Sequence, residues 1–181
     1  PKSTTIDDLK GFDFVFVCVP TPMKKNGVCD LSIVKAAIKD LTRHGVRIKK
    51  IILRSTVPVG TSQRLKVHLM PEFLTERNWK EDFYNNNLWV FGHDTDVDAG
   101  TVEKLNNLIC TARDQGSIKN AKTTFVSTRT AEFIKYGRNS FLAVKVSVFN
   151  ELEEFCSKND ISYSVAANLI GSDERIGMSH T

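Results

Sequence analysis

The sequence has few cysteines, and their spacing suits neither a metal site nor a disulfide framework. The four among 181 residues are Cys18, Cys29, Cys110 and Cys156, and none belongs to a CxxC pair or lies at a Cys/His metal spacing. Cys18 and Cys156 lie in apolar segments, where a free thiol behaves as a small hydrophobe. We therefore predict no metal site and a reducing, cytoplasmic setting.

Long apolar runs, leader-like segments, low-complexity tracts and internal repeats are also missing. No stretch is long and apolar enough for a transmembrane helix. The net charge is only +4, with both signs interspersed along the chain. The main basic cluster, Arg47 to Lys50, has none of the interleaved aromatic residues that a nucleic-acid surface uses, so we interpret it as a solvated connection. We expect neither a membrane nor a nucleic acid as partner.

The residues that are present indicate a globular α/β protein. The hydrophobic content of 41% and the charged content of 25% are typical of a soluble domain. Short apolar runs alternate with segments of helical spacing, and the loops between them are short, which predicts a mainly parallel sheet. The predicted strands are residues 12–19 (buried on both faces), 50–56, 67–70, 88–93 and 122–127. The predicted helices before the last strand are residues 31–44, 61–66 and 98–110.

From residue 128 the pattern changes. Residues 128–158 contain no proline and carry apolar side chains at helical spacing, which predicts one long helix that bridges domains or forms a dimer surface. Ser162 or Ser164 can cap a final helix that ends near Ile170. We predict a domain over residues 1–127 and a helical region over residues 128–181.

Three loops directly follow predicted strands. They are Pro20 to Pro22, Ser55-Thr56 and Pro71 to Glu76. The carboxyl ends of parallel strands share one edge of a sheet, and ligands bind at that edge. We therefore expect these loops to converge.

Several residues in or near these loops can carry chemistry, and each also has a plainer interpretation. Lys135 and Asn139 are four residues apart on one helical face, where they can hold an anionic oxygen or form a solvated surface. Thr56 can orient a water or a cofactor amide, or only end the strand. Glu72, partly buried against Phe73, can act as a general base, or its carboxylate can accept bonds from backbone amides.

Arg175 completes the set of candidates. It can bind phosphate or sugar oxygens. The alternative is an ion pair with the neighbouring Asp173 or Glu174. No single candidate decides the function, but the order of the motifs that contain them does.

Five motifs resemble, in the same order, those of the UDP-glucose/GDP-mannose (nucleotide-sugar) dehydrogenase family, most closely its UDP-glucose 6-dehydrogenases. They are VPTP (19–22), RSTVPVGT (54–61), PEFLTE (71–76), AEFIKYGRNSFLAVKVSVFNE (131–151) and GSDERIG (171–177). The resemblance spans residues 13–177. It implies a partial Rossmann-like, doubly wound sheet followed by a long central helix and a helical dimerisation region. Residues 1–127 then form the C-terminal half of an NAD-binding domain, and residues 128–181 form a truncated central region.

The resemblance also implies a chemistry. Such enzymes oxidise the primary alcohol of a nucleotide sugar twice with NAD, through a cysteine-bound thioester, and convert UDP-glucose to UDP-glucuronate. By motif, Glu72 matches the general base of thioester hydrolysis and Thr56 matches the residue that orients water near the nicotinamide. Lys135 and Asn139 match the pair that holds the reacting oxygen.

The remaining matches concern binding. Thr21 and Glu76 match positions on the cofactor side, and the backbone of Phe73 and Leu74 matches residues that meet the nucleotide sugar. Arg175 matches an arginine that reaches the substrate of a neighbouring subunit in a homodimer formed through the long helix. RSTVPVGT and DERIG favour UDP-glucose, although GDP-mannose and UDP-N-acetylmannosamine relatives share most motifs.

Two family features are not among these 181 residues: the glycine-rich turn that cradles the NAD pyrophosphate, and the GGSCFPKD-like segment with the catalytic cysteine. We therefore expect an internal portion of such an enzyme that does not turn over UDP-glucose alone. The alternative is a catalytically incompetent nucleotide-sugar-binding or dimerising module. A generic flavodoxin-like domain ranks last because no phosphate loop is present.

Overall fold

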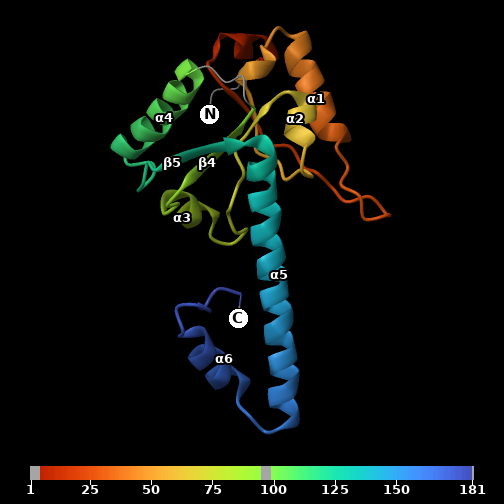
Figure 1. Ribbon diagram of the computed structural model, residues 1–181, viewed down its shortest axis with the longest axis vertical. Coiled ribbons are helices and arrows are strands. Elements are labelled where there is room, and N and C mark those ends of the chain that lie inside the picture. Colours follow the sequence, from red (N-terminus) through yellow and green to blue (C-terminus); the bar gives the residue numbers. More distant parts are fainter. Residues whose placement is uncertain (1–4, 95–98, 181) are drawn as a thin grey trace. The chain divides into compact units, whose positions relative to one another are not determined.

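The computed structural model describes residues 5–94 and 99–180. The chain forms two compact units, Pro1–Lys135 and Tyr136–Thr181. The first unit contains a five-stranded sheet in the order β1-β2-β3-β4-β5 (Figure 1). Its strands are β1 (Val15–Val17), β2 (Ile51–Leu53), β3 (His68–Leu69), β4 (Trp89–His93) and β5 (Thr123–Ser127).

The sheet is mainly parallel, as predicted, with one antiparallel pair. β1 pairs with β2, β2 with β3 and β4 with β5 in parallel, whereas β4 runs antiparallel to β3 with Leu69 opposite Gly92. Each predicted strand forms within its predicted range, but β1 and β2 cover only three residues each of the predicted ranges 12–19 and 50–56, and β3 covers two of residues 67–70. The prediction that this segment is buried on both faces is wrong, because Phe16 is 37% exposed between the buried Val15 and Val17.

Helices cover both faces of the sheet, which makes it doubly wound (Figure 1). Side chains alternate between the faces of a strand, so Ile51 and Leu53 pack with α1 on one side and Ile52 packs with α4 on the other. The helices and 3-10 turns of this unit before the last strand are η1 (Ile6–Gly11), α1 (Ser32–Arg43), η2 (Ile48–Lys50), α2 (Thr61–Leu65), α3 (Trp79–Tyr84) and α4 (Ala99–Asp114). Helix α3 and both 3-10 turns were not predicted. The predicted helix start at Asp98 lies outside the described residues.

The long helix α5 (Thr128–Lys158) has the predicted bounds and begins directly after β5. Its first turns pack closely on the sheet at Gly92. A Cβ atom on Gly92 would lie 2.8 Å from the Ala131 Cβ and 3.0 Å from the Thr128 Cα, closer than packed carbon atoms approach. Glycine at position 92 therefore sets how closely α5 approaches β4.

The second unit contains the rest of α5, helix α6 (Tyr163–Gly171) and the segment after it. Lys145 is buried, and its Nζ donates to the main-chain oxygens of Ile176 at 2.9 Å, Gly177 at 2.7 Å and Ser179. These three bonds use all the protons of an ammonium group. Lys145 therefore fastens the last described segment to α5.

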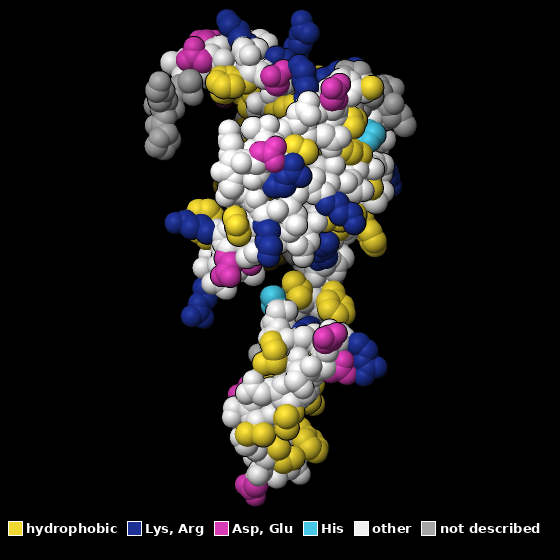
Figure 2. Space-filling view, turned by 90° about the vertical axis from the view of Figure 1, so that its left-hand side faces the viewer, with side chains coloured by type: hydrophobic (Ala, Val, Ile, Leu, Met, Phe, Trp, Pro, Cys, Tyr) yellow, Lys and Arg dark blue, Asp and Glu magenta, His cyan; other side chains and the backbone are white. Residues whose placement is uncertain are grey.

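Apolar side chains remain exposed on this second unit. They include Phe141, Val144, Val148 and Phe155 on α5 and Val165 and Leu169 on α6. Figure 2 shows hydrophobic side chains gathered on this part of the surface. Among the described residues, no helix combines the length and the apolar character that a bilayer span requires.

Candidate functional site

The loops that follow β1 and β2 lie against each other. The Thr21 hydroxyl donates to the main-chain oxygen of Thr56 at 2.8 Å, and the Ser55 hydroxyl donates to that of Val19 at 2.5 Å. Two loops that are far apart in the sequence thus meet at the carboxyl edge of the parallel strands, as expected. The main-chain oxygen of Thr56 is therefore bonded to the loop that follows β1.

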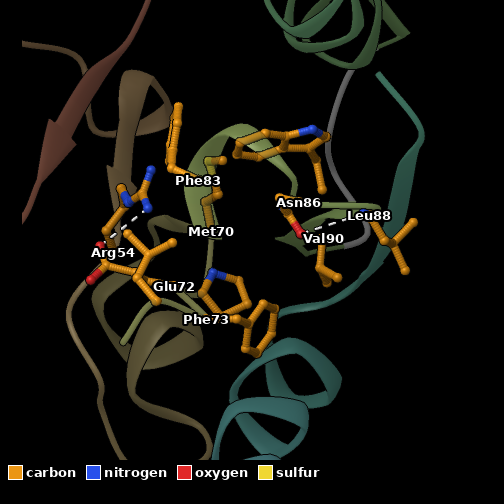
Figure 3. A pocket seen from close by; sticks show the side chains of 11 residues that line it. Arg54, Met70, Glu72, Phe73, Phe83, Asn86, Leu88 and Val90 are labelled. Atoms are coloured by element: carbon orange, nitrogen blue, oxygen red, sulfur yellow. Dashed lines mark hydrogen bonds and ion pairs between the residues drawn. The ribbon is translucent and has the colours of Figure 1, made fainter. Parts of the chain in front are cut away.

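Glu72, at the end of β3, meets the chain that follows β2. Its Oε2 lies 3.1 Å from Nη2 of Arg54, and Figure 3 shows the two side chains pointing toward each other. The Arg54 side chain is 14% exposed and that of Glu72 is 44% exposed. The carboxylate of Glu72 is therefore half-buried and forms an ion pair with Arg54.

Lys135 connects α5 to the same loop. Its Nζ donates to the main-chain oxygen of Glu72 and lies 5.7 Å from the centre of the Phe73 ring. Thr56 and Lys135 line one cavity of about 10 Å³, which is room for about one water molecule. Glu72, Thr56 and Lys135, predicted separately from three motifs, thus lie together, and Lys135 is partly buried.

Two residues of this site were missed by the sequence analysis. One is Arg54, which pairs with Glu72. The other is Glu132, which is 1% exposed and whose Oε1 accepts a bond from the Ser62 amide at 2.7 Å, while its Oε2 accepts one from the Gly60 amide. A signal for Glu132 was present, because a carboxylate at position 132 interrupts an otherwise apolar stretch of the helix that contains Lys135.

A larger cavity, of about 620 Å³, opens beside Glu72. It falls in the size range of small-molecule sites. Arg54, Glu72 and Leu74 line it together with aromatic side chains, namely Phe16, Trp79, Phe83 and Trp89. The Arg54 guanidinium lies 6.0 Å from the centre of the Phe83 ring, and its Nε is buried without a hydrogen-bond partner among the described residues.

Cys18 also lines this cavity. Partial burial of its thiol raises the pKa, although the positive charge of Arg54 opposes the shift. A thiol with a raised pKa is protonated at neutral pH and is a poor nucleophile. Cys18 therefore lacks the character of a catalytic cysteine.

The other predicted residues lie around or apart from this cluster. Phe73 and Leu74 follow Glu72 and line a smaller pocket beside it (Figure 3), and Glu76 is exposed in the turn beyond them. Asn139 is exposed on α5, one turn after Lys135, and belongs to the second unit.

Arg175 also belongs to the second unit, and it pairs with Asp173. The Arg175 guanidinium contacts both carboxylate oxygens of Asp173, with Nε 3.0 Å from Oδ1. These hydrogen bonds raise the pKa of Arg175 and lower that of Asp173. The Arg175 side chain is 89% exposed, so the pair presents the guanidinium to solvent. Arg175 thus forms an ion pair with Asp173 while its guanidinium remains exposed.

The family models match nearly the whole chain. Residues 2–110 match the NAD-binding domain of the UDP-glucose/GDP-mannose dehydrogenase family, and residues 129–181 match its central domain.

Among residues 5–94 and 99–180, no three His, Cys, Asp or Glu side chains are placed to share a metal ion.

Curated relatives and a solved structure agree with the family models. A UDP-glucose 6-dehydrogenase of Rickettsia bellii is 33% identical over 94% of this chain and 40% of the relative, and TuaD of Bacillus subtilis is 32% identical over 93% and 38%. The chain thus spans about 40% of the length of these relatives. The structure of a UDP-glucose dehydrogenase from Pyrobaculum islandicum superposes with a TM-score of 0.79 and 26% identity over 98% of this chain and 43% of that chain.

Proposed function

Because the chain belongs to the UDP-glucose/GDP-mannose dehydrogenase family, we propose that it carries part of the active site for the NAD-dependent oxidation of UDP-glucose to UDP-glucuronate. The observation that carries the proposal is the convergence of Glu72, Thr56 and Lys135. They come from the ends of two strands and from the start of α5, and they supply a base, a hydroxyl and a cation in one place.

Each group has a chemical role. The ammonium of Lys135 stabilises negative charge that develops on the reacting oxygen of the sugar, an effect that is strong in a site shielded from water. The carboxylate of Glu72 takes a proton from the water that hydrolyses the acyl intermediate. The Thr56 hydroxyl orients that water, and Asn139 on the next turn of α5 shares the reacting oxygen with Lys135.

The chain's own residues fit one side of a dinucleotide site. Bound NAD supplies the hydride acceptor. The Thr21 hydroxyl and the main chain of Thr56, which it contacts, lie at the carboxyl edge of two adjacent parallel strands, where dinucleotides bind in open α/β sheets. Thr21 in the loop after β1 and Glu76 in the loop after β3 would face the cofactor, while Phe73 and Leu74 would meet the nucleotide sugar.

We further propose that a second copy of this chain covers the exposed apolar side chains of the second unit. Phe141, Val144 and Val148 recur at helical spacing along α5, and each is at least half exposed. An apolar stripe of this kind is typical of a helix that packs against another helix. In such a homodimer Arg175 is available to the substrate of the neighbouring subunit.

A second candidate function is a nucleotide-sugar-binding or dimerising module without catalysis. The two candidates share the binding site and differ in turnover.

Calorimetric titration of the chain with UDP-glucose and with NAD tests the proposal. We expect UDP-glucose to bind, Lys135→Met to weaken binding and the exposed control Lys39→Met on α1 to leave it unchanged. GDP-mannose and UDP-N-acetylmannosamine, titrated in the same way, rank the substrates. No heat with any of the three nucleotide sugars contradicts the proposal.

An assay of NADH formation then separates the two functions. We expect no family-like turnover by the chain alone. Turnover restored when the glycine-rich and cysteine-containing segments of a relative are supplied supports the enzyme. Binding without turnover, even then, supports the module.

A further inference from the structure

The most deeply buried acidic side chain in the described first unit has no role in the proposed chemistry. Glu132 is 1% exposed, on the second turn of α5. Its two carboxylate oxygens accept bonds from two backbone amides, those of Gly60 and Ser62, which flank the start of α2. A buried carboxylate is costly unless its oxygens are bonded, so these two amides are what makes the position tolerable.

The segment that Glu132 holds is the loop after β2. Gly60 ends this loop in a left-handed conformation, with φ of +87°, that glycine adopts without strain. The other end is tied to the β1 loop through Thr21 and Ser55. Thr56 therefore lies in a short segment with one fixed end on the sheet and the other on α5.

The same two turns of α5 also hold the loop after β3. Lys135 is three residues after Glu132 and donates to the main-chain oxygen of Glu72. A continuous helix keeps two such side chains at a fixed separation. Glu132 and Lys135, with Thr56, line the cavity of about 10 Å³.

We propose that Glu132 is a positioning residue: its carboxylate sets where Thr56 lies relative to Lys135 and Glu72. The two amide bonds support the effect of Glu132 on the position of Thr56. The importance of that position for catalysis rests on the proposed function. The Ser62 hydroxyl is buried without a hydrogen-bond partner among the described residues. The side chain of Ser62 thus does not replace the bond that its amide makes to Glu132.

Nuclear magnetic resonance of the full chain tests the placement directly. Glu132→Gln keeps the size of the side chain but replaces one accepting carboxylate oxygen with a side-chain amide NH2 group, which donates. We expect the amide proton of Gly60 or Ser62 to move upfield and the resonances of Thr56 to shift in the folded state. Glu151→Gln, an exposed glutamate on the same helix, leaves all three unchanged. A role in stability alone lowers the melting temperature without moving Thr56, and that result overturns the proposal.

A measurement on the wild-type chain keeps the test decisive if Glu132→Gln does not fold. We expect the Gly60 and Ser62 amides to exchange with solvent as slowly as those of β2, because each donates to a buried acceptor. If either the Gly60 or the Ser62 amide exchanges as fast as an exposed loop, the proposed bond to Glu132 is wrong.

Calorimetric titration tests whether Glu132 also affects the affinity for ligands. Where the wild-type chain binds NAD or UDP-glucose, we expect Glu132→Gln to weaken binding by about 10-fold, which corresponds to about 1.4 kcal/mol of binding free energy. Unchanged affinity in Glu132→Gln contradicts the positioning role. If the wild-type chain binds neither ligand, the proposed function fails, whereas the Thr56 resonances still decide whether Glu132 places the loop.

Discussion

Arg54 and Glu72 form an ion pair between the chain that leaves β2 and the loop that follows β3, with Nη2 3.1 Å from Oε2. The two partners differ in exposure, since the arginine is mostly buried and the glutamate is half-exposed. The cost of removing one partner depends on the charge that remains. We therefore expect mutation of Arg54 and mutation of Glu72 to lower the free energy of unfolding by different amounts.

We predict that Glu72→Met destabilises the chain more than Arg54→Met. The first leaves the guanidinium of Arg54 unpaired in its buried position, at a cost of about 1–2 kcal/mol after allowance for the exposure of Glu72. The second replaces the guanidinium with an apolar side chain against Phe83 and is close to neutral. Urea unfolding of both variants gives the order, and the reverse order is evidence against the pair as the main contact of Arg54.

Gly92→Ala tests the close approach of α5 to the sheet. The added methyl group overlaps Ala131 and Thr128, so we expect a loss of about 1–3 kcal/mol in the free energy of unfolding. Gly137→Ala is the matched control, because a Cβ atom at that helical position meets nothing within 4 Å. It should stabilise the chain by about 0.5–1 kcal/mol. Equal effects of the two substitutions are incompatible with the described packing.

Lys145→Met tests the fastening of the last described segment to α5. The substitution leaves three main-chain oxygens without their donor, and we expect faster hydrogen exchange in residues 173–179 together with a stability loss of about 1–3 kcal/mol. Lys158→Met, which removes an exposed pair with Glu154, should cost less than about 0.5 kcal/mol. Unchanged exchange in residues 173–179 argues against the role of Lys145.

Acid should loosen the segment that contains Glu72 and Glu76. The Thr75 hydroxyl and amide both donate to the Asp82 carboxylate and lower its pKa below the ordinary value of 3.8. A carboxylate with a lowered pKa in the folded state contributes stability that is present above 3.8 and is lost as the pH falls through the folded value. The melting temperature, measured from pH 6 to about pH 2, should therefore fall more steeply in the wild type than in Asp82→Asn. Parallel curves rule this contribution out.

The proposed homodimer gives a prediction for solution size. Val148→Glu places a charge within the exposed apolar stripe of α5, and burial of an unpaired charge is costly. We expect the wild-type chain to sediment as a dimer and the variant as a monomer. Val28→Glu, at an exposed valine of the first unit, should leave the dimer intact. A monomeric wild-type chain removes the basis for this interface.

The helices and strands of the fold differ in how far the sequence predicts them. The bounds of α5 follow from a proline-free helical pattern that begins directly after a β-strand and ends before the final helix, and these signals are local. The antiparallel step between β3 and β4 has no such signal, because strand direction depends on how the intervening chain folds. Helix α3 was missed because its sequence, WKEDFY, is short and mostly polar or aromatic.

The site shows the same division. Glu72, Thr56 and Lys135 were predicted because each belongs to a motif at a strand end or on a helical face. Arg54 and Glu132 were missed because their importance comes from partners 18 and 70–72 residues away. Only the folded chain brings such partners within bonding distance.

The bond from Glu132 to the start of α2 has a consequence for the order of folding. Helix α2 has five residues, and a helix of that length does not persist alone in water. The Ser62 amide at its start bonds to Glu132, which lies 70 residues further along the chain, so we expect α2 to be little formed in the folding transition state. Kinetic φ-values at Thr61 near those at Glu132, and below those in β2, would identify this order.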